Sequence, residues 1–221
     1  MISFNETSSI DPLLVAGTGL LGLILSPAAE WLISKILPRL GSIPASRTRI
    51  TTAILTGVLC AAFAFRLGSE PGLLAFMLLA VLGVQLARID ISLHLLPNPL
   101  VLSLLVGGLI CLLAAAAGGQ VWTDLVRATA SSAILFVTYM VLALISPNGM
   151  GMGDVKFAAP VGLYLGYLGW SQLLYGGLLG FILNGMVTLL FVRRNRAERP
   201  SEVPHGPTML AATVVIALFM V

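Results

Sequence analysis

Long apolar segments, each close to the length that crosses a lipid bilayer, follow one another along most of the 221-residue chain. A helix needs about 20 apolar residues to span the hydrocarbon layer. By that measure the sequence predicts about eight transmembrane helices, within a range of seven to nine. Their predicted bounds are residues 13–36, 50–67, 72–89, 99–117, 126–145, 155–169, 172–192 and 207–221. Because these segments lack the alternation of a membrane barrel strand, we predict an all-α, polytopic integral membrane protein.

The composition excludes a water-soluble fold. Apolar residues make up 58% of the chain and charged residues 10%, where a soluble domain carries roughly 25% charged residues. The basic pI of about 9.2 does not indicate nucleic-acid binding, because no basic patch with interleaved aromatic residues is present. Cys60 and Cys111 each lie in an apolar segment without a Cys-x-x-Cys partner, so we expect buried thiols and neither a disulfide nor a zinc site.

The basic residues predict the orientation of the chain in the membrane. If the N-terminus is outside, ten of the twelve Lys and Arg residues fall on the cytoplasmic side, which the positive-inside rule favours. The ten are Lys35, Arg39, Arg47, Arg49, Arg88, Lys156, Arg193, Arg194, Arg196 and Arg199; only Arg66 and Arg127 fall outside. The N-terminal residues before Pro12 carry no Lys or Arg, so the first apolar segment is expected to be a retained helix rather than a cleaved signal peptide.

Two of the nine acidic residues are candidates for chemistry. Asp90 follows the apolar run 78–89, and Asp154 stands at the head of the sixth predicted span. In the predicted topology both reach the same membrane face at similar depth, where an ionisable residue is costly and indicates function. The structural alternative is that each aspartate is the N-cap of a nearby helix. Glu30, near the inner end of the first span, could instead reach towards the headgroups or pair with Lys35.

Glycines precede the second aspartate at Gly149, Gly151 and Gly153. Such spacing predicts a backbone that bends or approaches another chain closely, for example an extended peptide substrate; a flexible turn would also satisfy it. Two carboxylates that share a site hold one proton between them and can hydrolyse an amide by acid–base catalysis. Either aspartate could hold the proton, because a coupled pair titrates jointly. No serine-hydrolase or zinc-protease motif is present.

Around both aspartates the sequence resembles the type IV prepilin leader peptidases, membrane aspartic proteases of the Gly-x-Gly-Asp class. Asp90 followed by Leu96, Pro97 and Asn98 matches the first motif of that family, and the segment 149–156 matches the second. Gly162 and Gly166 continue the second motif into its helix, and Pro204-His205-Gly206-Pro207 is a weaker match to a third. The resemblance covers residues 72–221, whereas residues 1–71 match only in hydropathy. We expect a single transmembrane peptidase domain over residues 1–221.

The resemblance implies an aspartic endopeptidase that removes the short basic leader from prepilins or pseudopilins at the cytoplasmic face of the cell membrane. It implies Asp90 and Asp154 as catalytic residues, with Gly149, Gly151, Gly153, Pro97 and Asn98 supporting the site or the substrate. It also suggests Lys156 as a residue that orients or charges the site, although a positive-inside anchor explains it equally well.

Many members of the family that also N-methylate the cleaved pilin carry two Cys-x-x-Cys pairs after the first span. Here that connection is short and has no cysteine, so neither methylation, S-adenosylmethionine, zinc nor another cofactor is expected. Three alternatives remain open: a small transporter with the aspartates as cation sites, an inactive homologue that only binds leaders, and an intramembrane protease of the presenilin kind. A transporter site would lie near the bilayer midplane rather than at span ends.

Overall fold

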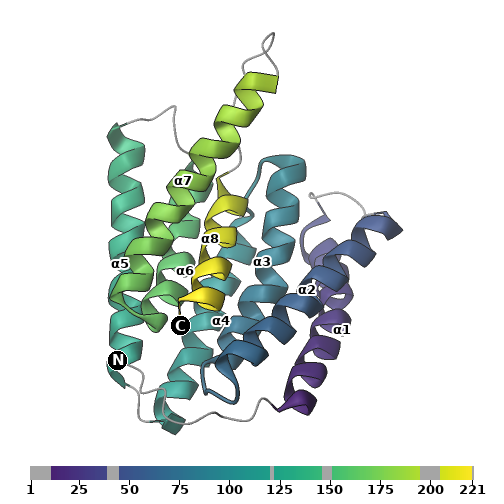
Figure 1. The fold of residues 1–221 in the computed structure, drawn as a ribbon. Helices are drawn as coiled ribbons and strands as arrows, with labels where there is room; N and C mark the ends of the chain where they lie inside the picture. Colours follow the sequence, from purple (N-terminus) through teal and green to yellow (C-terminus); the bar gives the residue numbers. More distant parts are fainter. Residues whose placement is uncertain (1–10, 39–44, 120–121, 146–150, 195–204, 221) are drawn as a thin grey trace. The chain divides into compact units, whose positions relative to one another are not determined.

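The computed structural model describes residues 11–38, 45–119, 122–145, 151–194 and 205–220. All the regular structure in these ranges is helical (Figure 1). The helices are α1 (Pro12–Ile36), α2 (Ser46–Leu67), α3 (Leu73–Leu93), α4 (Asn98–Gly119), α5 (Trp122–Ile145), α6 (Met152–Leu168), α7 (Trp170–Arg194) and α8 (Gly206–Phe219). The prediction of an all-α, multi-pass membrane protein with about eight helices is confirmed.

Six of the described helices are long and apolar enough to cross a membrane by themselves: α1 to α5 and α7. The 17 residues of α6 and the 14 residues of α8 reach about 26 and 21 Å at 1.5 Å per residue, which is less than the roughly 30 Å of hydrocarbon. Both of these shorter helices begin beside motifs that the sequence analysis singled out.

The ends of α3 and α6 differ from the predicted spans in a way that matters for the site. The third span was expected to end at residue 89, but α3 continues to Leu93 and therefore includes Asp90. A drop in hydropathy ends a hydrophobic run without ending the helix. The backbone ladder continues until His94, which takes the left-handed conformation with φ +52° while its N–H still bonds the carbonyl of Asp90. Similarly, α6 begins at Met152, so Asp154 lies inside its first turn.

The chain divides into two compact units, Met1–Gln85 and Leu86–Val221, and α3 passes from one into the other. This division describes how the helices pack and does not test where the peptidase domain begins or ends. The peptidase domain expected over residues 1–221, with weaker similarity over 1–71, remains a prediction.

In the first unit, α1 and α2 pack closely through small residues. A Cβ at Gly22 would lie 2.8 Å from the sulfur of Cys60, which is fully buried and unoxidised. Glu30 is 2% exposed. Its carboxylate accepts a 2.7 Å hydrogen bond from Thr52 and lies 3.4 Å from Arg49, both on α2.

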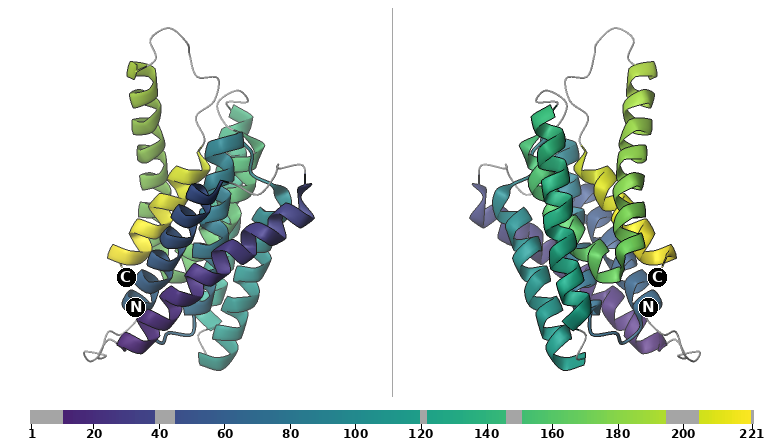
Figure 2. Two further views of the ribbon diagram at one scale, coloured as in Figure 1. Left: turned by 90° about the vertical axis from the view of Figure 1, so that its right-hand side faces the viewer. Right: turned by 90° about the vertical axis from the view of Figure 1, so that its left-hand side faces the viewer.

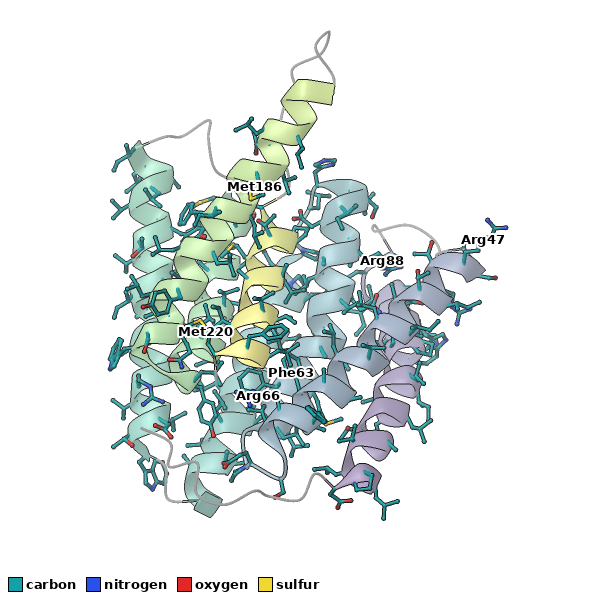
Figure 3. The ribbon with its side chains drawn as sticks, in the orientation of Figure 1. Arg47, Phe63, Arg66, Arg88, Met186 and Met220 are labelled. Atoms are coloured by element: carbon teal, nitrogen blue, oxygen red, sulfur yellow. The ribbon has the colours of Figure 1, made fainter. Side chains whose placement is uncertain are left out.

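The first unit also carries basic residues at both ends of α2, where Arg47 and Arg66 are drawn (Figure 3). Lys35, considered above as a partner of Glu30, has its ammonium group 4.0 Å from the ring centroid of Trp31. The buried Glu30 carboxylate therefore ties the C-terminal part of α1 to the N-terminal part of α2.

In the second unit, α6 packs against α4, α5, α7 and α8 (Figure 2). Glycines allow the close approach to α5, because a Cβ at Gly166 would lie 2.2 Å from the Cβ of Ser131. Arg127 of α5 holds the last turn of α6 through hydrogen bonds to the carbonyls of Gly166 and Tyr167 at 2.7 and 2.5 Å. These carbonyls have no partner within the helix, so the guanidinium acts as a C-terminal cap. The second unit thus holds α6, and with it Asp154, in a fixed position.

Candidate active site

Asp90 occupies an unfavourable place for a carboxylate. It lies in the last turn of α3 and is 4% exposed. The C-terminal end of a helix carries partial negative charge, which repels an acidic side chain. Asp90 is therefore not an N-cap, and the capping explanation considered from the sequence is wrong for this residue. A buried acid at the wrong end of its helix needs another reason to be present.

The N-terminus of α8 lies against the Asp90 carboxyl group. A Cβ at Gly206 would be 2.7 Å from Oδ2 of Asp90, and the Gly206 backbone N–H approaches the same carboxyl group. The positive end of a helix favours such an anion. Among the described residues, however, none makes a hydrogen bond of good geometry to Oδ2 itself. The imidazole of His94 lies within electrostatic range of the same carboxylate.

Asp154 lies in the first turn of α6, two residues after its first residue. The N-cap of α6 is Gly151, so Asp154 is not the capping residue, and its side chain lies near Gly151. Acidic residues in a first turn are favoured by the helix dipole, which gives Asp154 a structural role that Asp90 lacks. Its carboxylate is half-buried and interacts electrostatically with the hydroxyl of Tyr139 on α5.

One leucine connects the two motifs. The side chain of Leu96 lies 3.2 Å from a Cβ built at Gly153 and 3.3 Å from one built at Gly206. Gly153 immediately precedes Asp154, and Gly206 touches Asp90, so the two aspartate segments converge on the start of α8 in the second unit. The sequence predicted that the aspartates share one end of the protein, and the structure brings their flanking segments together.

The supporting residues of the predicted site fall at the starts of α4 and α6. Lys156 donates a 3.0 Å hydrogen bond to Oδ1 of Asn98, and both side chains are exposed. The carbonyl of Pro97 accepts the backbone N–H groups of Leu100 and Val101 and so begins α4. Gly149 lies outside the described residues.

Sequence reasoning missed three residues that border the site: Tyr139, His205 and Gly206. The segment 204–207 was noticed only as a weak third motif. Tyr139 was not predicted as a site residue, because it lies within the predicted span 126–145 and belongs to none of the motifs. Among the described residues, no group of three or more His, Cys, Asp or Glu side chains could hold a metal ion; the expectation of no metal or cofactor remains a prediction.

Comparison with known proteins decides the family. The model of the type IV leader peptidase family matches residues 73–191, which include both aspartates. The chain belongs to the type IV leader peptidase family. The segment that this family shares therefore contains α6 and most of the candidate site, while the start of α8 lies beyond it.

Curated relatives from this family are named prepilin leader peptidase/N-methyltransferase. The protein from Aeromonas hydrophila is 32% identical over 197 residues, 87% of this chain and 66% of that protein. The one from Aeromonas salmonicida is 33% identical over 170 residues, covering 75% and 56%, and the one from Xanthomonas campestris pv. campestris is 28% identical over 204 residues, covering 86% and 65%. The chain thus spans between about half and just under two thirds of the length of each of these relatives. No solved structure matches it.

Proposed function

We propose that this protein is an aspartic endopeptidase that removes the short basic leader of prepilin-like substrates, with Asp90 and Asp154 as its catalytic pair. The observation that carries the proposal is the convergence of the two aspartate segments on the N-terminus of α8, with Asp90 buried at the unfavourable end of its own helix. Family membership and the names of the relatives support the class of reaction.

The chemistry follows from sharing one proton between two carboxyl groups. The ionised aspartate accepts a proton from water, whose oxygen attacks the scissile carbonyl carbon, while the protonated aspartate donates a hydrogen bond to the carbonyl oxygen. The tetrahedral species then collapses, the carbon–nitrogen bond breaks, and the departing amine takes a proton from a carboxyl group. The products are a new carboxyl terminus on the leader and a new amino terminus on the mature protein.

The surroundings of the pair suit a peptide that arrives at the edge of the membrane. Gly151 is exposed and Gly153 is half-buried, so the backbone at the head of α6 is accessible to an extended substrate segment. We propose that Gly149, Gly151 and Gly153 line the substrate path, and that Lys156, Pro97 and Asn98 keep the two segments in place. The substrate partner would be a prepilin or pseudopilin whose apolar helix stays in the lipid bilayer.

We place the site at the cytoplasmic face of the cell membrane. Support comes from the charge pattern, since Arg88 and Lys156 lie within two residues of Asp90 and Asp154 and share their membrane face in the positive-inside topology. The proposal does not include N-methylation, although the relatives' names do. The connection between α1 and α2 contains none of the cysteines that the bifunctional members carry there.

The experiment is cleavage of a prepilin-like protein, with a short basic leader before an apolar helix, by wild type, Asp90→Asn and Asp154→Asn in detergent. Asparagine preserves size but removes the ionisable carboxyl group. Both variants should be expressed normally and lose cleavage by at least about a thousandfold, whereas near-normal activity in either would rule out the pair. Asp11→Asn is the matched control, because Asp11 caps α1 through Leu13 and asparagine caps equally well.

A further inference from the structure

A buried polar pair joins α5 to the residue before α8. Tyr139 is 1% exposed and His205 is 4% exposed, and the Tyr139 hydroxyl lies 3.0 Å from Nε2 of His205. Burying either group without a hydrogen-bond partner is unfavourable, so such pairs are kept only when both members are satisfied. Neither residue belongs to the catalytic pair proposed above.

The direction of this hydrogen bond can be assigned from its neighbours. The hydroxyl of Thr208 donates to the His205 carbonyl at 2.7 Å, which leaves only its oxygen lone pairs to face Nδ1 of the ring at 3.5 Å. The ring proton is therefore assigned to Nδ1, and Nε2 accepts from the Tyr139 hydroxyl. Burial lowers the pKa of His205 from 6.5 to about 4, so the ring is neutral near pH 7.

The ring of His205 also packs against two aromatic side chains, Phe181 and Tyr139. Its centroid lies 5.4 Å from that of Phe181 and 5.7 Å from that of Tyr139, while the Tyr139 and Phe181 rings stack at 5.1 Å. Packing of this kind would hold any ring of similar size. The hydrogen bond adds what packing lacks, because it selects one orientation of the imidazole and so one position of the backbone that follows it.

That backbone and the Tyr139 hydroxyl lie beside different aspartates. Gly206, next in the chain after His205, touches Asp90, and the Tyr139 hydroxyl interacts electrostatically with Asp154. We propose that Tyr139 and His205 are positioning residues whose hydrogen bond sets the start of α8 against Asp90 and thereby the spacing of the two aspartates. This inference rests on the proposed function, since it assumes that the aspartates act as a pair.

The test uses His205→Phe, Tyr139→Phe, the double variant and His205→Gln, assayed by cleavage kinetics and by melting temperature. His205→Phe keeps the ring but removes the acceptor, and we expect kcat to fall about tenfold or more with KM within about twofold. His205→Gln can still accept from the tyrosine and should recover most of the kcat. Tyr175→Phe, at an exposed tyrosine of α7, is the matched control and should behave as wild type.

The double variant separates positioning from simple stability. Removing both polar groups leaves no buried group unpaired, so its melting temperature should return towards that of wild type. If the pair positions the aspartates, kcat stays low although stability recovers. If kcat recovers together with stability, or if His205→Phe and Tyr139→Phe both keep wild-type kcat, the positioning proposal is overturned.

The catalytic proposal is judged by different variants. Cleavage by Asp90→Asn or Asp154→Asn would overturn the aspartate pair itself, and the positioning role with it. Inactive asparagine variants together with fully active Tyr139 and His205 variants would leave the pair standing and remove only the positioning role. Should His205→Phe fail to accumulate in the membrane, Tyr139→Phe and His205→Gln still give both readouts.

Discussion

The ammonium group of Lys156 donates a hydrogen bond to the side-chain oxygen of Asn98 across 3.0 Å. Asn98 is the first residue of α4, and Lys156 follows Asp154 in the first turns of α6. The bond therefore joins the segment that follows Asp90 to the helix that carries Asp154. Because both side chains are exposed, its contribution to the free energy of unfolding is expected to be small, about 1 kcal/mol or less.

If this contact aligns the two segments, Lys156→Met and Asn98→Ala should each lower kcat/KM several-fold, up to about fivefold for a hydrogen bond of about 1 kcal/mol. The double variant should lose no more than the worse single variant, because either change breaks the same bond. Cleavage kinetics on the four proteins measure the coupling. Losses that multiply would show that the residues act separately and would return Lys156 to the role of a membrane anchor.

Gly206→Ala should impair cleavage more than it impairs folding. The added Cβ would lie 2.7 Å from Oδ2 of Asp90, so the carboxyl group must move. The backbone at Gly206 is not among the described left-handed glycines, and alanine is otherwise favourable at a helix start. We expect activity to fall by about tenfold or more with unchanged helix content by circular dichroism; wild-type activity would show that the position of Asp90 is not critical.

Gly166→Ala should destabilise the protein, because its Cβ would overlap the Cβ of Ser131 at 2.2 Å and force α5 and α6 apart. Overpacking of this kind costs about 1–3 kcal/mol, which should appear as a lower melting temperature in detergent. Gly185→Ala on α7 is the matched control, since no atom lies within 4 Å of the added Cβ. Equal melting temperatures for the two variants would contradict the close contact of α5 with α6.

Acid should destabilise the second unit through His205. Its pKa is lowered by burial to about 4 in the folded protein but is 6.5 when unfolded. Above pH 6.5 both states are neutral and the residue has no effect. As the pH falls towards 4 the unfolded state binds a proton that the folded state does not, so stability is lost by up to about 3 kcal/mol.

The measurement is melting temperature against pH for wild type and His205→Gln. The ionisable residues Asp90, Asp154 and His94 are present in both proteins, so the difference between the two curves reports His205. The wild-type curve should fall more steeply between pH 6.5 and 4. Parallel curves would mean that the imidazole is not held neutral by its surroundings.

The membrane-spanning architecture could be predicted from the sequence because apolar length is a direct physical requirement of the bilayer. The end of α3 could not be predicted, because a helix continues past its last apolar residue for as long as its backbone N–H groups bond the carbonyls four residues earlier. Asp90 was expected just beyond a span and lies instead in the last turn of the helix. That difference removes the capping explanation and leaves its burial as the observation to be accounted for.

The two aspartates could be chosen from the sequence because acidic residues at span ends are few and lie beside distinctive glycines and prolines. Their neighbours could not. Tyr139 lies within a predicted span, and its approach to His205 is decided by tertiary packing. His205 was visible in the segment 204–207, but its partner 66 residues away is a tertiary contact that no local pattern encodes.

The position of Asp90 at the negative end of α3 has a consequence for evolution as well as for catalysis. A carboxylate that is 4% exposed and opposed by its own helix dipole lowers the stability of the protein that carries it. Asp90→Asn should therefore be inactive yet melt at a higher temperature than wild type. Without selection for its activity, a chain of this kind would be expected to lose this aspartate early, because the substitution raises the stability of the fold and removes only the activity.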